Sequence, residues 1–408
     1  MIEVFEYIEN QKKLVVEIQG KLTETPAVNP DNGGDGEYNK FLFLKNYISS
    51  WKFDHIEEII VPDDRVSSKK RPSLLAEIKG KNTSKSLWII THLDVVPAGE
   101  LELWNSDPFK ILVKDDKIYG RGTEDNQQSL VSSLIAVKSL IDNNIQPNIN
   151  IKLLFVADEE VGSKFGIKWI LNNKKEYFLK NDLFLIPDGG HNKGKTIEIA
   201  EKSILWMGFK IIGKQAHGSR PDLGINSSRA SSYFGVRMDR LNEIFNEKNE
   251  MYDIPYSTFE PTKRYNSIMN MNTIPGEEFI GYDCRILPEY DLEEIKNEIN
   301  KIVRSIEIDF GVKIEIEILQ NIQAPKPTPA DSEIVILLKK SIKKVLNIDA
   351  ITIGIGGGTV AADFRALGYN AAIWSTIDTT MHSPNEYSVI KNTLNDAKVF
   401  ADMMINSN

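Results

Sequence analysis

The stretch Ser86-Leu-Trp-Ile-Ile-Thr-His-Leu-Asp94 decides how the chain folds. Its four residues Leu87 to Ile90 form a short apolar run, which is typical of a strand buried on both faces of a sheet. The ionisable residues that follow would lie beyond the carboxyl end of the strand, where α/β sheets bind their ligands. His92 and Asp94 are two residues apart, so in an extended chain their side chains leave the same face. The pair fits a histidine that binds a ligand and a carboxylate that orients it. A strand with a polar exit explains the pair alone at least as well.

The composition matches a soluble protein and excludes several functions. The 408 residues are enough for two or three domains. A net charge of -9 argues against nucleic acid or an anionic membrane as the main partner. Cys284 is the single cysteine, and the N-terminus lacks the charged and apolar regions of a signal peptide. No apolar stretch approaches the ~20 residues of a membrane span. We therefore expect a cytoplasmic protein.

Two further apolar runs end in ionisable residues, as the opening stretch does. Residues 149–156 are followed by Glu159 and Glu160, and residues 183–186 are followed by Asp188. Helical patterns lie between these runs, and this alternation is typical of an α/β sheet. The repeated placement of ionisable side chains at strand exits favours one site at that edge of the sheet.

The sequence pattern changes near residue 198. Residues 198–322 combine half-exposed strands with two helical patterns, which is typical of a small α+β sandwich. The proline-rich segment 324–329 resembles a stiff linker, and the α/β pattern resumes after it. We therefore expect an α/β protein in which residues 1–197 and 323–408 form a catalytic domain. Its sheet would be mixed, mostly parallel and flanked by helices, and the sandwich at 198–322 would interrupt it.

Six ionisable residues at the predicted strand ends and loops form a candidate metal-binding set. They are His92, Asp125, Glu159, Glu160, Asp188 and His382. Imidazole nitrogens and carboxylate oxygens suit Zn²⁺ and related divalent ions. Two imidazoles and three carboxylates carry less negative charge than two divalent ions carry positive charge, so a bound water would become more acidic. The remaining carboxylate, Glu159 or Glu160, is then free to accept a proton from that water.

Some members of this set also have a simpler explanation. Residues 158–160 alone suit a solvated acidic turn, and Asp125 alone suits the N-cap of a following helix. Neither explanation accounts for the whole set. His191 suits a solvated loop better than a supporting role in the site, and His55 has no supporting motif.

Eight short motifs follow one another over most of the chain. They are His92-Leu-Asp94, Gly120-Arg-Gly-Thr-Glu-Asp125, Asp158-Glu-Glu-Val-Gly162, Pro187-Asp-Gly189, Ala216-His-Gly-Ser219, Asn272-Thr-Ile-Pro-Gly276, Gly357-Gly-Thr359 and Met381-His-Ser-Pro384. In this order they resemble the motifs of a co-catalytic zinc metallohydrolase family. The family includes aminoacylases, acetylornithine deacetylase, succinyl-diaminopimelate desuccinylase and glutamate carboxypeptidases.

The resemblance implies how the metal ligands divide between two divalent ions. His92 and Asp188 would bind one ion, Glu160 and His382 would bind the other, and Asp125 would bridge them. Zinc is the expected metal, and cobalt or manganese is compatible with the same ligands.

The resemblance also implies roles for residues that do not bind metal. Asp94 would orient His92, and Glu159 would be the general base that activates water and then protonates the leaving amine. His217 would belong to a lid and dimerisation domain formed by residues 198–322. From there it would reach the active site of the partner subunit and stabilise the oxyanion, so we expect a homodimer.

The expected substrate is a small molecule with a free carboxylate. Arg285 and the backbone donors of Gly358 and Thr359 are good carboxylate hosts. Asn272 matches a substrate contact of the family. A surface ion pair is an equally good explanation for Arg285.

The chain departs from the family pattern at two places. Asn126-Gln-Gln128 stands where many members have a Lys-Gly pair after the bridging aspartate. Val360-Ala-Ala-Asp363 follows Thr359, where the desuccinylase motif has a Ser-Asp pair. The first difference leaves the metal set intact, and the second argues against succinyl-diaminopimelate as the substrate.

These observations predict a hydrolase that cleaves an amide with metal-activated water and a glutamate base. It would be an N-acyl amino acid deacylase or an enzyme of the dipeptidase or carboxypeptidase type. The alternative is an inactive family member that serves as a ligand-binding or assembly protein, which a missing base or ligand would favour, and none is missing. A nucleophilic hydrolase built on Ser219 or Ser383 lacks a base and an acid at matching spacing.

Overall fold

The computed structural model describes residues 2–408, which form two compact units. The larger unit comprises the chain up to Ile199 together with Thr328–Thr352 and Thr359–Asn408. The smaller unit comprises Ala200–Pro327 and Ile353–Gly358. The segment Ile353–Gly358 therefore groups with the smaller unit, although it follows the proline-rich linker in sequence.

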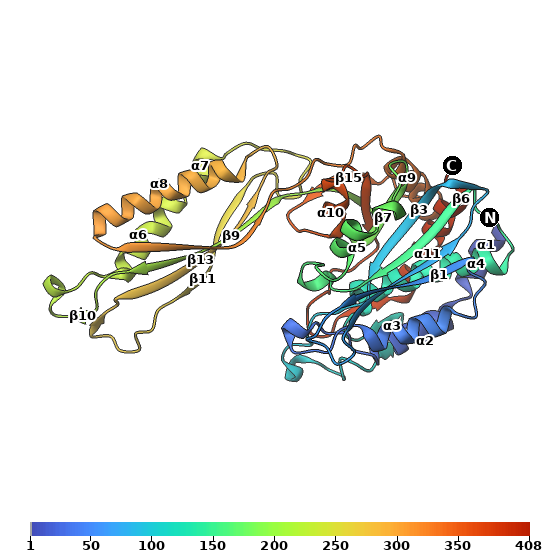
Figure 1. Ribbon diagram of the computed structural model, residues 1–408, viewed down its shortest axis with the longest axis horizontal. Helices are drawn as coiled ribbons and strands as arrows, with labels where there is room; N and C mark the ends of the chain where they lie inside the picture. Colours follow the sequence, from blue (N-terminus) through green and yellow to red (C-terminus); the bar gives the residue numbers. More distant parts are fainter. Residues whose placement is uncertain (1) are drawn as a thin grey trace. The chain divides into compact units, whose positions relative to one another are not determined.

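An eight-stranded mixed sheet forms the centre of the larger unit (Figure 1). Its strands are, in spatial order, β1 (His55–Pro62), β2 (Lys70–Ile78), β6 (Ile149–Val156), β3 (Asn82–His92), β7 (Leu183–Gly190), β16 (Ala371–Ser375), β8 (Thr196–Glu201) and β15 (Ile351–Ile355). The four strands β6, β3, β7 and β16 pair in parallel, while β1–β2, β2–β6 and β16–β8 pair antiparallel. The expected mixed α/β sheet is confirmed, and its parallel part lies at the centre.

The central strands are buried on both faces, as the apolar run at Leu87–Ile90 predicts. Trp88 and Ile90 pack in one cluster with Phe184, with Ile167 of α5 and with Phe364 of α10. Leu87 and Ile89 point to the opposite face and are also fully buried. Burial of each large apolar side chain contributes about 1.5–3 kcal/mol. The tightly packed sheet therefore holds in place the residues that follow the carboxyl ends of its central strands.

Helices flank this sheet. They are α1 (Ile2–Glu9), α2 (Lys12–Thr23), α3 (Tyr38–Ile48), α4 (Ser129–Asp142), α5 (Ile167–Asn173), α9 (Glu333–Leu346), α10 (Val360–Ala366) and α11 (Ile390–Asn406). Helix α11 packs against both α4 and α9. A small second sheet joins β4 (Leu112–Lys114), β5 (Lys117–Tyr119) and β17 (Tyr387–Val389). Among residues 2–408, no helix has the length and apolar character needed to cross a membrane.

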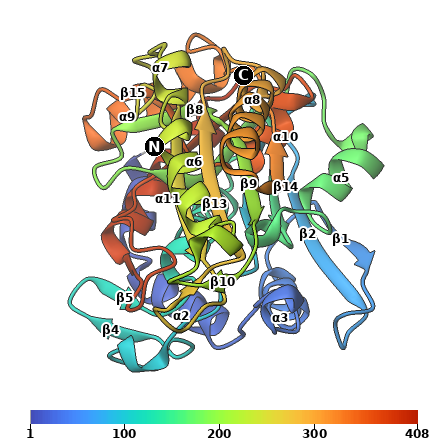
Figure 2. The same cartoon turned by 90° about the vertical axis from the view of Figure 1, so that its left-hand side faces the viewer.

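The smaller unit has a four-stranded antiparallel sheet with helices on one face (Figures 1 and 2). Its strands are β11 (Thr258–Tyr265), β13 (Glu277–Ile286), β9 (Ser203–Ile212) and β14 (Lys313–Ile322), and its helices are α6 (Ser227–Met238), α7 (Leu241–Ile244) and α8 (Leu292–Phe310). Phe209 of β9 and Phe234 of α6 lie in the core between the layers. This is the α+β sandwich expected from the sequence. A short pair, β10 (Ala216–His217) with β12 (Thr273–Ile274), extends from it.

A buried carboxylate on α11 costs the larger unit stability. Asp396 accepts hydrogen bonds from Thr376 N (3.0 Å) and Gln128 Nε2 (3.3 Å) through Oδ2. Its Oδ1, Gln128 Oε1 and Thr376 Oγ1 are buried without a hydrogen-bond partner in the described chain. Burial raises the pKa of Asp396 to about 7, despite those hydrogen bonds. The folded state therefore holds a proton that the unfolded chain releases near pH 4.

We predict that Asp396→Asn stabilises the protein at pH 8. The wild-type folded pKa lies above the unfolded pKa, so its free energy of unfolding falls between about pH 4 and pH 7 by up to ~4 kcal/mol. Asparagine has no such titration, so we expect a gain of roughly 2–4 kcal/mol at pH 8 and little gain near pH 4. Urea unfolding at both pH values measures this difference.

Asp402→Asn is the matched control, because Asp402 is a buried aspartate of the same helix that pairs with Lys344 (2.5 Å). Its replacement removes an ion pair and is not expected to stabilise at pH 8. Equal pH dependence in wild type and Asp396→Asn would contradict the prediction.

Candidate active site

Four parallel strands deliver four candidate ligands to one edge of the sheet. His92 ends β3, Asp188 lies near the end of β7, and Glu160 follows β6 in the turn Glu159–Val161. His382 lies in the loop that follows β16. The spatial order β6-β3-β7-β16 places these strands side by side, so their carboxyl ends lie at the same edge.

Asp125 brings the four candidate ligands together. Its Oδ1 lies 2.9 Å from His92 Nε2, and its Oδ2 lies 3.1 Å from His382 Nε2. Asp188 Oδ1 lies 3.5 Å from His92 Nε2, and Glu160 Oε2 lies 3.2 Å from His382 Nε2. Two groups of three potential ligands result, and both include Asp125. Within each group the ligand atoms lie within 4.8 Å of one another.

The donor set fits two divalent ions. Imidazole nitrogens and carboxylate oxygens are the ligands that zinc and similar ions use. Glu160 Oε1 is buried and has no hydrogen-bond partner in the described chain, so one ligand oxygen is left for an ion. Hydrogen bonds to Asp125 and Glu160 raise the pKa of His382 to about 10. Neighbouring carboxylates stabilise the protonated imidazole when no metal ion is present, and the raised pKa reflects this effect.

Asp94 holds the segment that carries Glu159 and Glu160. Its Oδ1 and Oδ2 accept hydrogen bonds from the Glu159 and Glu160 amides, each at 3.0 Å. The nearest acceptor to His92 Nδ1 is the Asp94 carbonyl oxygen at 3.0 Å, while the Asp94 carboxylate lies 3.5 Å away. Asp94 therefore positions two neighbouring segments at once, through its backbone and through its side chain.

Glu159 lies beside the candidate ligands. Burial raises its pKa well above the usual range, and the negative charge of Asp188 adds to this effect. A divalent ion nearby would oppose the shift, because positive charge favours the carboxylate form. Glu159 therefore lies in the same buried, acidic region as the candidate ligands His92 and Asp188.

Glu124 and Glu386 connect the two loops that carry Asp125 and His382, and the sequence did not reveal either role. Glu386 accepts hydrogen bonds from the amides of Gly122, Glu124 and Asp125, each at 3.0 Å, and pairs with Arg121 (2.6 Å). Glu124 in turn accepts from backbone amides of the His382 loop. Their partners lie about 260 residues away in sequence, so only the folded chain reveals them.

Further buried groups position the remaining ligand segments. Asn126 Nδ2 donates to Asp188 Oδ1 (2.7 Å), so it fixes the orientation of that carboxylate. Asp158, which has a left-handed φ of 66°, accepts from Arg71 Nη2 (2.9 Å) and Asn29 Nδ2 (2.7 Å). Arg71 is itself fully buried and paired with Glu37. The turn before Glu159 is therefore anchored by a buried ion pair network.

His217 and Asn272 lie together in the smaller unit. His217 pairs with Thr273 across β10 and β12, and the Gly218 amide donates to the Asn272 carbonyl (2.7 Å). The His217 ring is exposed, and its Nδ1 contacts Ser219 Oγ (2.8 Å). The partners of His217 Nδ1 are the Ser219 hydroxyl and amide, not a carboxylate. The Ser219 arrangement therefore lacks the third group of a nucleophilic triad.

The predicted carboxylate hosts have partners of their own. Arg285 makes a bidentate pair with Asp283 (2.6 and 2.9 Å) and donates to the Gly356 carbonyl (2.9 Å). A substrate carboxylate at Arg285 would share or displace Asp283. The Thr359 side chain caps α10 by accepting a hydrogen bond from Ala361 N. Gly358 precedes it, and the space where a side chain would stand at Gly358 is bordered by Ile204 (3.5 Å).

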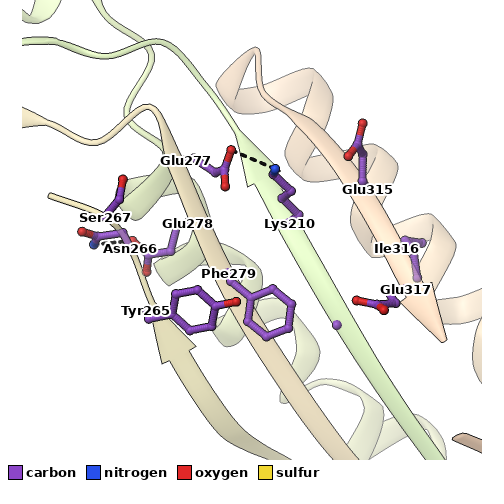
Figure 3. Close-up of a pocket in the computed structure, with 11 residues that line it drawn as sticks. Lys210, Tyr265, Asn266, Ser267, Glu277, Glu278, Phe279, Glu315, Ile316 and Glu317 are labelled. Carbon is purple, nitrogen blue, oxygen red and sulfur yellow. Dashed lines mark hydrogen bonds and ion pairs between the residues drawn. The ribbon is translucent and has the colours of Figure 1, made fainter. Parts of the chain in front are cut away.

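The remaining sequence candidates lie outside this cluster. His191 lies in a turn in which its Nδ1 accepts from the Lys193 amide (3.1 Å), and Ser383 is exposed. An open hollow of about 480 Å³ lies on the sheet of the smaller unit, where the Tyr265 and Phe279 rings stack beside Lys210 (Figure 3). Its lining includes four glutamates and none of the candidate ligands, so it does not suit a carboxylate substrate.

Comparison with known proteins agrees with this geometry. Residues 88–406 match the sequence model of peptidase family M20/M25/M40. The chain is 42% identical to an uncharacterized metallohydrolase of Methanocaldococcus jannaschii, over 95% of this chain and 98% of the relative. It is 27% identical to a succinyl-diaminopimelate desuccinylase of Orientia tsutsugamushi, over 95% of each chain. The fold resembles human carnosine dipeptidase 1 with a TM-score of 0.77, covering 98% and 97% of the two chains at 16% identity.

We predict that Asp94→Asn weakens metal binding without abolishing it. Asparagine can accept from only one of the two amides and presents a donor to the other, so the Glu160 segment loosens while every ligand stays. Loss of such a supporting group lowers metal affinity by ~10–100-fold. Titration calorimetry with ZnCl₂ measures the change.

Asp182→Asn is the control, because Asp182 caps the other end of the same strand through Ser86 N (2.7 Å) and Trp88 Nε1 (2.9 Å). It is expected to lower stability and leave zinc affinity within about threefold. Unchanged zinc affinity in Asp94→Asn would refute the role given to Asp94.

Proposed function

Since the chain belongs to peptidase family M20/M25/M40 and is a metal-dependent hydrolase of amide or peptide bonds, we propose which residues perform the reaction. The observation that carries the proposal is Asp125, which lies between two imidazoles and is shared by two groups of potential ligands. His92, Asp125 and Asp188 would hold one ion, and Asp125, Glu160 and His382 would hold the second. We propose zinc, with cobalt or manganese as substitutes that suit the same donors.

Glu159 is the proposed general base. When bound, two divalent ions at these ligands would lower the pKa of a water molecule and polarise the substrate carbonyl. Glu159 accepts the proton of that water as it attacks the carbonyl carbon, then delivers the proton to the nitrogen of the cleaved bond. Its burial beside His92 and Asp188 supports this role, because a base must lie close to the water that it deprotonates. Asp94 keeps Glu159 in place through the Glu159 amide.

The substrate we propose is an N-acyl amino acid or a small peptide with a free carboxylate. His217 would stabilise the oxyanion from the partner subunit of a homodimer, with Asn272 nearby, just before β12. Arg285, Gly358 and Thr359 would receive the carboxylate. Relatives named desuccinylase and a structural neighbour named dipeptidase support both substrate classes. We place the enzyme in the cytoplasm, since it has a single cysteine.

We predict that Glu159→Gln lowers kcat by ~10²–10⁴-fold while both metal ions stay bound, because a neutral amide cannot accept the proton. The assay uses N-acetyl, N-succinyl and N-formyl amino acids and dipeptides, each with Zn²⁺, Co²⁺ or Mn²⁺ after chelation. Metal content is measured on the same samples.

Glu176→Gln is the control, because Glu176 is an exposed glutamate of the larger unit. A Glu159→Gln enzyme with near wild-type kcat would exclude Glu159 as the base. A wild-type protein that binds metal and turns over no substrate of the panel would favour a binding role instead.

We predict that two inactive variants restore activity when mixed. In a dimer with His217 acting on the partner's site, Glu159→Gln and His217→Ala chains combine into hybrids with one intact site. After subunit exchange the mixture should recover roughly a quarter of wild-type activity, because half of the dimers carry one intact site of two. Each variant alone provides the baseline. No recovery despite exchange, or a monomer in light scattering, would show that His217 does not act across subunits.

A further inference from the structure

The loop that carries His382 adopts an unfavourable backbone conformation. Thr379, His382 and Asn385 all have φ close to 60°, in the left-handed region that residues with a Cβ disfavour. The His382 side chain is about half exposed, so packing contributes little to its position. The other candidate ligands lie on strands or in partly buried turns. This loop therefore needs specific interactions to remain in the conformation that places His382 beside Asp125.

Glu124 supplies such interactions. One carboxylate oxygen accepts from the Asp378 amide (2.6 Å), and the other accepts from the Thr380 amide, Thr380 Oγ1 (2.8 Å) and the Met381 amide (3.0 Å). Glu124 is 3% exposed. All four donors lie within four residues of His382, and both oxygens are used. Glu124 is therefore not free to bind an ion, although it precedes the shared ligand Asp125.

The interactions run in both directions between the two loops. Glu386, which follows His382, holds the amides of the Asp125 turn, while Glu124 in that turn holds the amides of the His382 loop. Hydrogen bonds from amides to a charged oxygen are stronger than those to a neutral one. The distance between Asp125 and His382 is thus fixed by two buried carboxylates that bind no metal.

We propose that Glu124 is a positioning residue that determines occupancy of the second metal pocket, formed by Asp125, Glu160 and His382. This inference rests on the proposed two-ion function. The first pocket does not depend on Glu124 in the same way, because His92 lies on β3 and Asp188 is held by Asn126. The effect of Glu124 should therefore be confined to one of the two ions.

The test is zinc binding by Glu124→Gln. Glutamine has the same shape, but one of the two oxygens becomes an NH2 donor. In either orientation of the side chain, this NH2 faces a backbone N–H of the His382 loop, and two donors cannot form a hydrogen bond. We expect affinity for the second zinc to fall ~10–100-fold and affinity for the first to change less than about threefold. His382→Ala and Asp188→Asn identify which binding step belongs to which pocket. Visible absorption of the Co²⁺ protein gives an independent readout of the same pocket.

Two further variants separate positioning from general destabilisation. Gln127→Met removes a buried hydrogen bond with Thr23 (2.9 Å) from the same turn without touching the His382 loop, so any loss of zinc affinity should fall on both ions alike, through the shared ligand Asp125. Thr380→Val removes one of the four donors and should weaken only the second zinc, by ~3–10-fold. Thr380→Val carries the test if Glu124→Gln does not fold.

The outcomes distinguish this inference from the proposed function. Wild type that binds two ions, with a selective loss in the second step of Glu124→Gln, supports the inference. Unchanged binding, or equal loss of both ions, overturns it and leaves the two-ion site standing. Wild type that binds a single ion overturns the two-ion function and the inference together.

Discussion

The site depends on one carboxylate, Asp125, held between two imidazoles. His92 and His382 approach its two oxygens at 2.9 and 3.1 Å from opposite sides, and Asp188 and Glu160 lie just beyond. So many acidic oxygens within a few ångströms repel one another unless positive charge lies among them. Divalent ions held by these residues would provide that charge. The order of the central strands follows the same need, since each parallel strand brings one ligand to the edge where Asp125 arrives.

Most of the precision of the site comes from carboxylates that bind no ion. Asp94, Glu124 and Glu386 each use both oxygens to accept hydrogen bonds from backbone amides of segments that carry candidate ligands or the proposed general base. These acceptors satisfy N–H groups that irregular loops would otherwise leave buried and unpaired. These three carboxylates also add negative charge around the candidate ligands, which would strengthen the attraction of the site for a metal ion. The platform beneath is rigid because the central strands are buried on both faces.

The segment that departs from the family pattern is integrated into this arrangement. Asn126 donates to Asp188, Gln127 accepts from Thr23, and Gln128 donates to the Thr376 carbonyl (2.6 Å). Three consecutive amide side chains thus tie the Asp125 turn to three other parts of the larger unit. The difference from the Lys-Gly pattern changes which neighbours support the turn and leaves the ligand set unchanged.

The sequence alone determined the α/β class and predicted an α+β sandwich, and its motifs named the residues proposed as ligands. A buried strand is predicted by a local apolar run such as Leu87–Ile90, and the ionisable residues at its end follow that run directly in the sequence. The tertiary structure decided what those residues contact. It placed the Asp94 carboxylate on the Glu159 and Glu160 amides, placed Arg285 against the Gly356 carbonyl, and joined Glu124 to a loop more than 250 residues away. Such partners cannot be predicted from one sequence, because hydrogen bonds between distant segments depend on distances that only the folded chain sets.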